Sequence, residues 1–251
     1  MSGSLILMPN ALDLGTEVVP LEDVLPLGVI RRAARLTHWA AEDARSARAF
    51  LKRVAAIEPL AVPLQAMAIA ELPRPRKGSG EAVPQQAWSD LLKPALAGHD
   101  LGLISEAGLP AVADPGAALV AAAHAQGVPV LPLAGASSLL LALAASGLNG
   151  QSFSFVGYLP QDPPARAARL RELEALSRRT GQTQLLIETP YRNAAVLAAV
   201  LDSLAPTTRV SVSCGLTLPE GWTRTDTVAR WRDKPVQMPD RLPAVIGLSA
   251  S

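Results

Sequence analysis

Short apolar runs and segments of helical periodicity alternate from the start of the chain. Residues 5–8 (Leu-Ile-Leu-Met) form an apolar run ended by Pro9, which predicts a buried strand followed by a loop. Apolar residues then recur at helical spacing from about 21 to 36, and residues 37–41 predict a second strand. Asp43 stands where it can cap the next helix, so this part of the chain predicts a β-α-β-α order.

The same alternation continues to the end of the chain. Further strands are expected at 101–104, 128–133, 153–156, 184–187, 209–216, 222–228 and 243–248, and further helices at 117–126, 139–145, 165–179 and 191–204. A helix stop at 147–150 predicts an N-terminal α/β domain over 1–148 and a C-terminal α/β domain over 149–251. The order favours parallel pairing early in the chain and antiparallel pairing late.

The loops after the predicted strands are the candidate site, because ligands in open α/β sheets bind beyond the carboxyl ends of the strands. These loops are 9–15, 41–45, 105–116, 133–138 and 188–192. None of them contains a Gly-x-Gly-x-x-Gly or P-loop pattern, which argues against dinucleotide and nucleoside triphosphate sites. The small residues Gly108, Gly135 and Ser137 let the main chain approach an adenosine or amino-acid group closely.

The composition excludes a disordered chain, since 49% of the residues are hydrophobic and 18% are charged. The 23 Lys and Arg residues against 22 Asp and Glu leave a formal charge of +1. No global positive field therefore attracts nucleic acid, and any RNA contact must be local. The basic segment 72–80 is rich in Pro and Gly, which predicts a surface connection suited to contact with a polyanion.

Cysteine and histidine usage predicts a metal-free protein without disulfides. Cys214 is the single cysteine, and the three histidines lie far apart in sequence, so zinc-ligand spacing is absent. The start of the chain lacks a secretory signal, and Gly and Pro divide the uncharged stretch 115–161 into pieces too short to span a membrane. We therefore expect a cytoplasmic protein without membrane contact.

Local patterns offer structural explanations for several of the candidate residues. Glu42 and Asp43 before a helix favour a cap over a catalytic pair, and Asp114 before Pro-Gly favours a helix N-cap over chemistry. The histidines are expected to be structural or exposed, and Cys214 is expected to be a small buried apolar residue. A capping residue can still face the ligand, so Glu42 and Asp43 also remain candidates for chemistry.

Taken in order along the chain, the loop motifs resemble the tetrapyrrole methylase family. They are Ala-Glu-Asp-Ala-Arg (41–45), Ser-Glu-Ala-Gly-Leu-Pro with Asp-Pro-Gly (105–116), Pro-Leu-Ala-Gly-Ala-Ser (132–137), Ser-Gly-Leu (146–148), Phe-Val-Gly-Tyr-Leu-Pro (155–160) and Glu-Thr-Pro-Tyr-Arg (188–192). Within the family they are similar to the branch that modifies the RNA of the small ribosomal subunit. Segments 213–218 and 241–245 depart from that branch at expected substrate contacts, as in a diverged paralogue.

This resemblance implies a two-domain α/β fold of the tetrapyrrole methylase type, with mixed sheets flanked by helices. It further implies a homodimer and a cleft between the domains that holds S-adenosylmethionine. The cofactor contacts that it assigns are Pro9, Glu106, Leu109, Ser137, Ser138, Glu188, Leu216, Pro243 and Ala244. Glu106 stands where the family usually has an aspartate.

Three hypotheses about the function of the chain follow from these residues. For a ribose 2′-hydroxyl of RNA, a carboxylate takes the proton, and the candidates are Glu42, Asp43 and Glu188. Arg45 and Arg192 would then hold a phosphate of ribosomal RNA. A tetrapyrrole or another small-molecule substrate is the alternative, which the lack of a basic surplus favours. The third hypothesis is a protein that binds the cofactor without catalysis.

Overall fold

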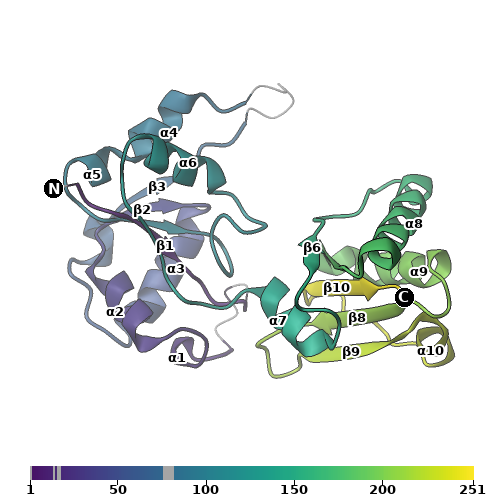
Figure 1. Cartoon of the computed structure of the whole chain (residues 1–251). Helices are drawn as coiled ribbons and strands as arrows, with labels where there is room; N and C mark the ends of the chain where they lie inside the picture. Colours follow the sequence, from purple (N-terminus) through teal and green to yellow (C-terminus); the bar gives the residue numbers. More distant parts are fainter. Residues whose placement is uncertain (1, 14, 16–17, 76–81) are drawn as a thin grey trace. The chain divides into compact units, whose positions relative to one another are not determined.

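The structure of the chain is a computed structural model that describes all residues except 1, 14, 16–17 and 76–81. Contacts divide the chain into two units, Met1–Ser137 and Ser138–Ser251. Each unit is built around its own sheet, with helices against it (Figure 1). The expected α/β class with sheets flanked by helices is therefore confirmed.

The sheet of the first unit is parallel throughout its described residues. Its strands are β1 (Leu5–Met8), β2 (His38–Ala41), β3 (Ala68–Glu71), β4 (Leu101–Ile104) and β5 (Val130–Pro132). They stand in the order β3-β2-β4-β1-β5, with every pairing parallel. Parallel sheets are covered on both faces, which explains why β1 and β4 are nearly uninterrupted apolar runs.

Helices cover both faces of this sheet. They are α1 (Leu21–Val24), α2 (Leu27–Arg35), α3 (Ala44–Ala55), α4 (Gln85–Leu91), α5 (Lys93–Leu96) and α6 (Ala117–Ala125), with a 3-10 turn at Leu64–Ala66. Successive strand residues point to opposite faces. Ile6 accordingly shares a core with Leu51 of α3, whereas Leu5 shares a different core with Leu119 of α6. The carboxyl ends of all the parallel strands meet at one edge, where the candidate loops begin.

The second unit contains a mixed sheet. Its strands are β6 (Phe153–Phe155), β7 (Thr183–Glu188), β8 (Arg209–Cys214), β9 (Trp222–Thr227) and β10 (Ala244–Ser249). The order is β6-β7-β10-β8-β9, in which only the β6–β7 pairing is parallel within the described residues. The expected change from parallel to antiparallel pairing along the chain is thus confirmed.

Helices also cover both faces of the second sheet. They are α7 (Ser138–Ser146), α8 (Pro163–Thr180), α9 (Asn193–Ser203) and α10 (Val228–Asp233), with a 3-10 turn at Pro190–Arg192. Leu186 and Ile246 pack with residues of α8, α9 and α10. On the other face, Val245 and Ile187 pack with Leu139 of α7. Cys214 is buried in the larger core, as expected for a small apolar residue.

Several boundaries differ from the sequence-based expectations. The helix expected over 21–36 is interrupted at Leu25 and Pro26, where Pro26 becomes the N-cap of α2. The division of the units comes at Ser137 rather than at 148, because α7 contacts β8, β9 and β10 of the second unit. Most of the expected surface connection 72–80 lies outside the described residues. Within the described part of the chain, every helix is too short or too polar to cross a bilayer.

Candidate functional site

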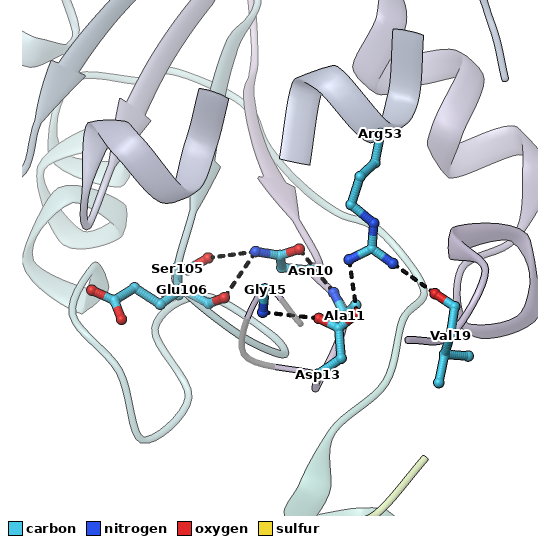
Figure 2. A network of polar contacts seen from close by, with 8 residues as sticks. All are labelled: Asn10, Ala11, Asp13, Gly15, Val19, Arg53, Ser105 and Glu106. Carbon is cyan, nitrogen blue, oxygen red and sulfur yellow. Dashed lines mark hydrogen bonds and ion pairs between the residues drawn. The ribbon is translucent and has the colours of Figure 1, made fainter. Parts of the chain in front are cut away.

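Asn10 joins the loop after β1 to the loop after β4 at the carboxyl edge of the first sheet (Figure 2). Its Nδ2 donates to the carbonyl oxygens of Ser105 (3.2 Å) and Glu106 (2.9 Å), and its Oδ1 accepts from the Ala11 amide (2.9 Å). Its own amide donates to the Gly108 carbonyl at 2.9 Å. Sequence reasoning missed Asn10, although a polar residue two positions after a buried strand was the available signal.

Glu42 joins the loop after β2 to the same loop after β4. The amide of Glu42 donates to the Ile104 carbonyl at 3.0 Å, and its Oε2 accepts from the Glu106 amide at 3.1 Å. Arg74 Nη2 donates to the Glu42 carbonyl at 2.9 Å. One Glu42 oxygen therefore holds the backbone at Glu106, which is a structural role. The side chain nevertheless lies at the carboxyl edge of the first sheet, where the candidate loops meet.

Asp43 caps α3, as the sequence predicted. Its Oδ1 accepts from the amide (2.7 Å) and the hydroxyl (2.9 Å) of Ser46. These hydrogen bonds, first that from the Ser46 amide and then that from its hydroxyl, lower the pKa of Asp43 below its ordinary value. A carboxylate held in its charged form in this way is a weak acceptor for a catalytic proton.

Four carboxyl groups gather at this edge, and we call Glu42, Asp43, Glu106 and Asp114 the acidic cluster. Burial, followed by repulsion from Glu42 and Asp43, raises the pKa of Glu106. Burial, followed by repulsion from Glu42 and Glu106, raises the pKa of Asp114 to about 6. No group of His, Cys, Asp and Glu side chains in the described residues is arranged to hold a metal ion. The acidic cluster therefore concentrates negative charge at this edge of the sheet.

The prediction that Asp114 caps a helix is wrong. The helix α6 begins at Ala117, its N-cap is Gly116, and the cap has no side-chain hydrogen bond. Gly116 has a φ of 133°, which glycine tolerates and which turns the chain between Asp114 and the helix. Asp114 is consequently left at the ligand edge with a perturbed pKa, which is typical of functional sites.

A pocket of about 240 Å³ lies beside the acidic cluster, between the loop after β1 and α3. Its lining residues are Asn10, Asp13, Gly15, Arg45, Ser46, Ala49, Phe50, Arg53 and Glu106. Asp13 Oδ2 and Arg53 Nη1 form a buried ion pair at 2.9 Å (Figure 2). Gly15 donates its amide to Asp13, and Arg53 also donates to the Val19 carbonyl. Arg45 forms no salt bridge with any described residue, so it is the cation of this pocket that can meet a ligand.

The remaining predicted cofactor contacts of the first unit lie near the same edge. Pro9 is buried directly after β1, Leu109 is half-buried, and Ser137 is buried before α7. A Cβ at Gly135 would lie 2.2 Å from the Cβ of Pro9. Glycine at this position therefore lets the loop after β5 pack on the loop after β1. The sequence predicts close approach to a ligand at Gly135, and the structure gives this residue a packing role as well.

In the second unit, Glu188 ends β7 and is buried. Its Oε1 accepts from the amide (2.8 Å) and hydroxyl (3.1 Å) of Thr189. Its Oε2 lies 3.2 Å from Arg192 Nη2, close enough for an ion pair although neither atom has an aligned hydrogen bond. Ala244 pairs in register with Glu188. The structure thus brings together three of the predicted site residues and shows that Glu188 and Arg192 neutralise each other.

Leu216 and Pro243 lie at the same end of this sheet. Pro243 accepts from the Gly215 amide at 3.0 Å, and Leu216 packs in a small core with Leu139 and Val245. Ser138 is the first residue of α7. The predicted contacts of the second unit therefore form a second group, supported by its own sheet.

The described fold and site can be compared with known proteins. A family model described as Tetrapyrrole (Corrin/Porphyrin) Methylases matches residues 26–230. Ribosomal RNA small subunit methyltransferase I of Vibrio cholerae is 38% identical over 133 residues, which cover 53% of this chain and 45% of that protein. The chain spans half or less of the length of the curated relatives that it matches.

Solved structures share the fold. The crystal structure of the methyltransferase CobJ matches with a TM-score of 0.55 at 19% identity and covers 100% of both chains. Uroporphyrin-III C-methyl transferase from Thermus thermophilus, complexed with S-adenyl homocysteine, matches with a TM-score of 0.51 at 17% identity, over 98% of this chain and 97% of that chain. These likenesses confirm the expected two-domain fold.

Proposed function

Because the chain belongs to the tetrapyrrole (corrin/porphyrin) methylase family, we propose that it is an S-adenosylmethionine-dependent methyltransferase that acts on RNA. The name of the Vibrio cholerae relative supports a ribosomal RNA acceptor, and the S-adenyl homocysteine complex of the Thermus thermophilus enzyme supports the cofactor. The matches cover half or less of each relative's length, and the shared fold does not specify an acceptor. The residues of the site therefore carry the rest of the proposal.

The observation that carries the cofactor assignment is the acidic cluster on loops with little side-chain bulk. S-adenosylmethionine bears a sulfonium and an ammonium group, and carboxylates favour positive charge nearby. Glu106 and Asp114 have raised pKa values because burial and repulsion from neighbouring carboxylates outweigh the effect of any nearby cation. A cationic ligand would relieve that repulsion, so the side chains present fit this cofactor.

When bound, the cofactor supplies a methyl group that its sulfonium already activates, so the protein's own residues need to align the acceptor and remove a proton. Methylation of a hydroxyl forms a carbon–oxygen bond, breaks the carbon–sulfur bond and releases one proton. We infer that Asp114 takes it, since a base is most effective when its pKa lies near the working pH. Asp43 is occupied by its cap, and Glu188 by Thr189 and Arg192.

Arg45 is the group that we assign to a phosphate of the acceptor. It is exposed, lines the pocket beside the acidic cluster and forms no salt bridge with a described residue. Arg192 is a weaker candidate, because its charge is already balanced by Glu188 at 3.2 Å. The proposed cofactor contacts of the first unit are Pro9, Glu106, Leu109 and Ser137. Those of the second unit are grouped at the end of its sheet and are Ser138, Leu216, Pro243 and Ala244.

Calorimetry with the purified chain tests the cofactor assignment. We expect S-adenosylmethionine and S-adenosylhomocysteine to bind with micromolar affinity and to raise the melting temperature. Absence of both heat and thermal stabilisation at millimolar ligand would remove the proposed function.

The acceptor is tested by mass spectrometry of ribosomal RNA from cells that lack the gene, where one methyl group should be missing.

A small-molecule acceptor is the second candidate, and the acidic cluster favours it. Four carboxyl groups at the site repel an RNA backbone, and residues 1–137 carry a formal charge of −2 from 11 Lys and Arg against 13 Asp and Glu. Ribosomal RNA with its full set of methyl groups in the knockout, together with calorimetric cofactor binding, would support this candidate.

A homodimer in the cytoplasm is also part of the proposal, and sedimentation velocity of the purified chain tests the dimer.

A further inference from the structure

We propose that a pocket at the opposite, amino edge of the first sheet binds a phosphomonoester. The pocket has a volume of about 490 Å³, and its lining includes Gly3, Arg32, Arg35, Thr37, His99 and Asp100. These residues precede β1, end α2 and lead into β2 and β4. The acidic cluster follows the carboxyl ends of the same strands, so this amino-edge pocket is a separate site within the first unit.

Asp100 orients Arg32 in the amino-edge pocket. Asp100 Oδ1 accepts from the Ser4 amide at 2.8 Å, and its Oδ2 accepts from Arg32 Nη2 at 2.8 Å. Both carboxylate oxygens are therefore in use. The Nε of Arg32 is buried and has no hydrogen-bond partner among the described residues. A buried donor without an acceptor is unfavourable, so a small movement of the Arg32 side chain that exposes its Nε to an oxygen of a ligand would be favoured.

Arg35 supplies the uncompensated charge. It is exposed in the last turn of α2 and forms no salt bridge with a described residue. Its position also suits the negative end of the helix dipole, which explains a cation there without a ligand. That explanation does not account for the neighbouring Arg32 Nε or for the imidazole of His99 in the lining, and the pocket keeps a positive surplus once Asp100 has balanced Arg32.

One imidazole, that of His99, adds to the donors that line the pocket. The rings of His99 and His38 stack with centroids 4.9 Å apart and an angle of 28° between their planes. The hydroxyl of Thr37 lies 3.0 Å from Nδ1 of His38. Burial, followed by the charge of His99, lowers the pKa of His38. The exposed His99 is left to donate an N–H toward the pocket, whether neutral or protonated.

Size and chemistry together indicate the ligand class. Guanidinium and imidazole donors match the oxygens of a phosphate group. Sites for small molecules have volumes of roughly 300–1,000 Å³, so this pocket has room for an organic group in addition to the phosphate. Its polar lining favours a hydrophilic group such as a sugar. We therefore assign a sugar phosphate rather than inorganic phosphate alone.

Proton NMR of the three histidine rings of the full chain can test this site directly, because His99 lines the pocket, His38 stacks on His99, and His124 lies on α6. We expect ribose 5-phosphate to shift the signals of His38 and His99 saturably and to leave that of His124 unchanged. Ribose should shift none of them, and inorganic phosphate should bind more weakly than ribose 5-phosphate. Equal binding by inorganic phosphate would overturn the sugar-phosphate assignment, and absence of saturable shifts with either probe would overturn the site.

A pair of variants on one helix separates specific from general charge effects. Arg35→Gln should weaken ribose 5-phosphate binding by about tenfold. Arg31→Gln removes the same charge from α2, but Arg31 faces Glu58 at 3.7 Å and does not line the pocket, so affinity should stay the same. Equal effects of the two variants would contradict the proposal. Calorimetry with S-adenosylmethionine on the same samples shows independently whether the proposed methyltransferase function holds.

Discussion

At the scale of single residues, Asp114 illustrates how burial makes a carboxyl group useful. The ordinary pKa of an aspartate is 3.8, and burial with two neighbouring carboxylates raises that of Asp114 to about 6. Below pH 3.8 the group is protonated in the folded and the unfolded chain alike. As the pH rises from there to about 6, the unfolded chain releases the proton first, so folding stability is lost through this window and stays lower above it.

Replacing Asp114 by Asn should therefore stabilise the protein at neutral pH. We expect Asp114→Asn to raise the free energy of unfolding by about 1 kcal/mol at pH 7.5, less than full linkage would give because the side chain is partly exposed to water. Below pH 4 the variant should match the wild type. Urea unfolding at both pH values measures this, and destabilisation at pH 7.5 would show that the charged Asp114 has a structural partner. Methyl transfer should fall in the same variant.

Arg45 lies in the first helical turn, where the helix dipole disfavours a cation by a few tenths of a kcal/mol to about 1 kcal/mol. Arg45→Ala should therefore change the free energy of unfolding by less than about 0.5 kcal/mol and leave cofactor affinity unchanged. Binding of the anionic acceptor should weaken by about tenfold. Arg48→Ala is the matched control, since Arg48 is exposed on the same helix and does not line the pocket. Loss of stability with acceptor affinity intact would make Arg45 a structural residue.

At the scale of elements, the site depends on loops that are anchored to one another. Asn10 holds the loop after β4 through two carbonyl oxygens while its own amide bonds Gly108. Asn10→Ala should lower the free energy of unfolding by about 2 kcal/mol, because two carbonyls lose a buried donor. Cofactor affinity should fall with it, since Glu106 loses its anchor.

Asn149 provides the control for Asn10. It also bonds a distant carbonyl, that of Gly181 at 2.7 Å, but it does so at an exposed turn of the second unit. Asn149→Ala should cost less than about 1 kcal/mol and leave cofactor binding unchanged. Chemical unfolding and calorimetry of both variants compare the two positions. Equal losses of cofactor affinity would contradict a specific role for Asn10.

How much of the fold could be predicted depends on how each element buries its residues. The strand β1 was predictable because a fully buried parallel strand is an uninterrupted apolar run. The strand β3 (Ala68–Glu71) was not predicted, because it is mostly exposed at the sheet edge and has no apolar period. The helix α10 was not predicted, and the strand expected over 222–228 extends only into its first residue, since the cap at Thr227 continues the strand pattern of β9.

The same reasoning applies to the site. Sequence order was enough to select the loops that lie at the carboxyl edge, because parallel strands place them there. It could not show that Asp114 stays free of the α6 cap or that Glu188 and Arg192 neutralise each other, since both depend on side-chain directions. The acidic cluster arises from two loops that are far apart in sequence, and no local motif encodes the repulsion that raises the pKa of Asp114.

At the scale of the whole molecule, charge is distributed unevenly between the units. Residues 1–137 have a formal charge of −2, whereas residues 138–251 carry 12 Lys and Arg against 9 Asp and Glu, a charge of +3. Much of that surplus lies on α8, whose basic residues are Arg166, Arg169, Arg171, Arg178 and Arg179. An RNA acceptor would therefore find its electrostatic attraction in the second unit, while the acidic cluster in the first unit is proposed to bind the cofactor.

The salt dependence of RNA binding tests this division of roles. Arg171 and Arg179 are exposed on α8 and form no salt bridge with described residues. Each phosphate contact contributes about 0.7 to 0.9 to the slope of log affinity against log salt concentration, so Arg171→Gln with Arg179→Gln should reduce the slope by about 1.5. Arg48→Gln with Lys52→Gln removes equal charge from α3 in the first unit and should leave the slope unchanged. A larger effect of the α3 pair would place the RNA on the first unit, and a slope near zero for the wild type would favour the small-molecule acceptor.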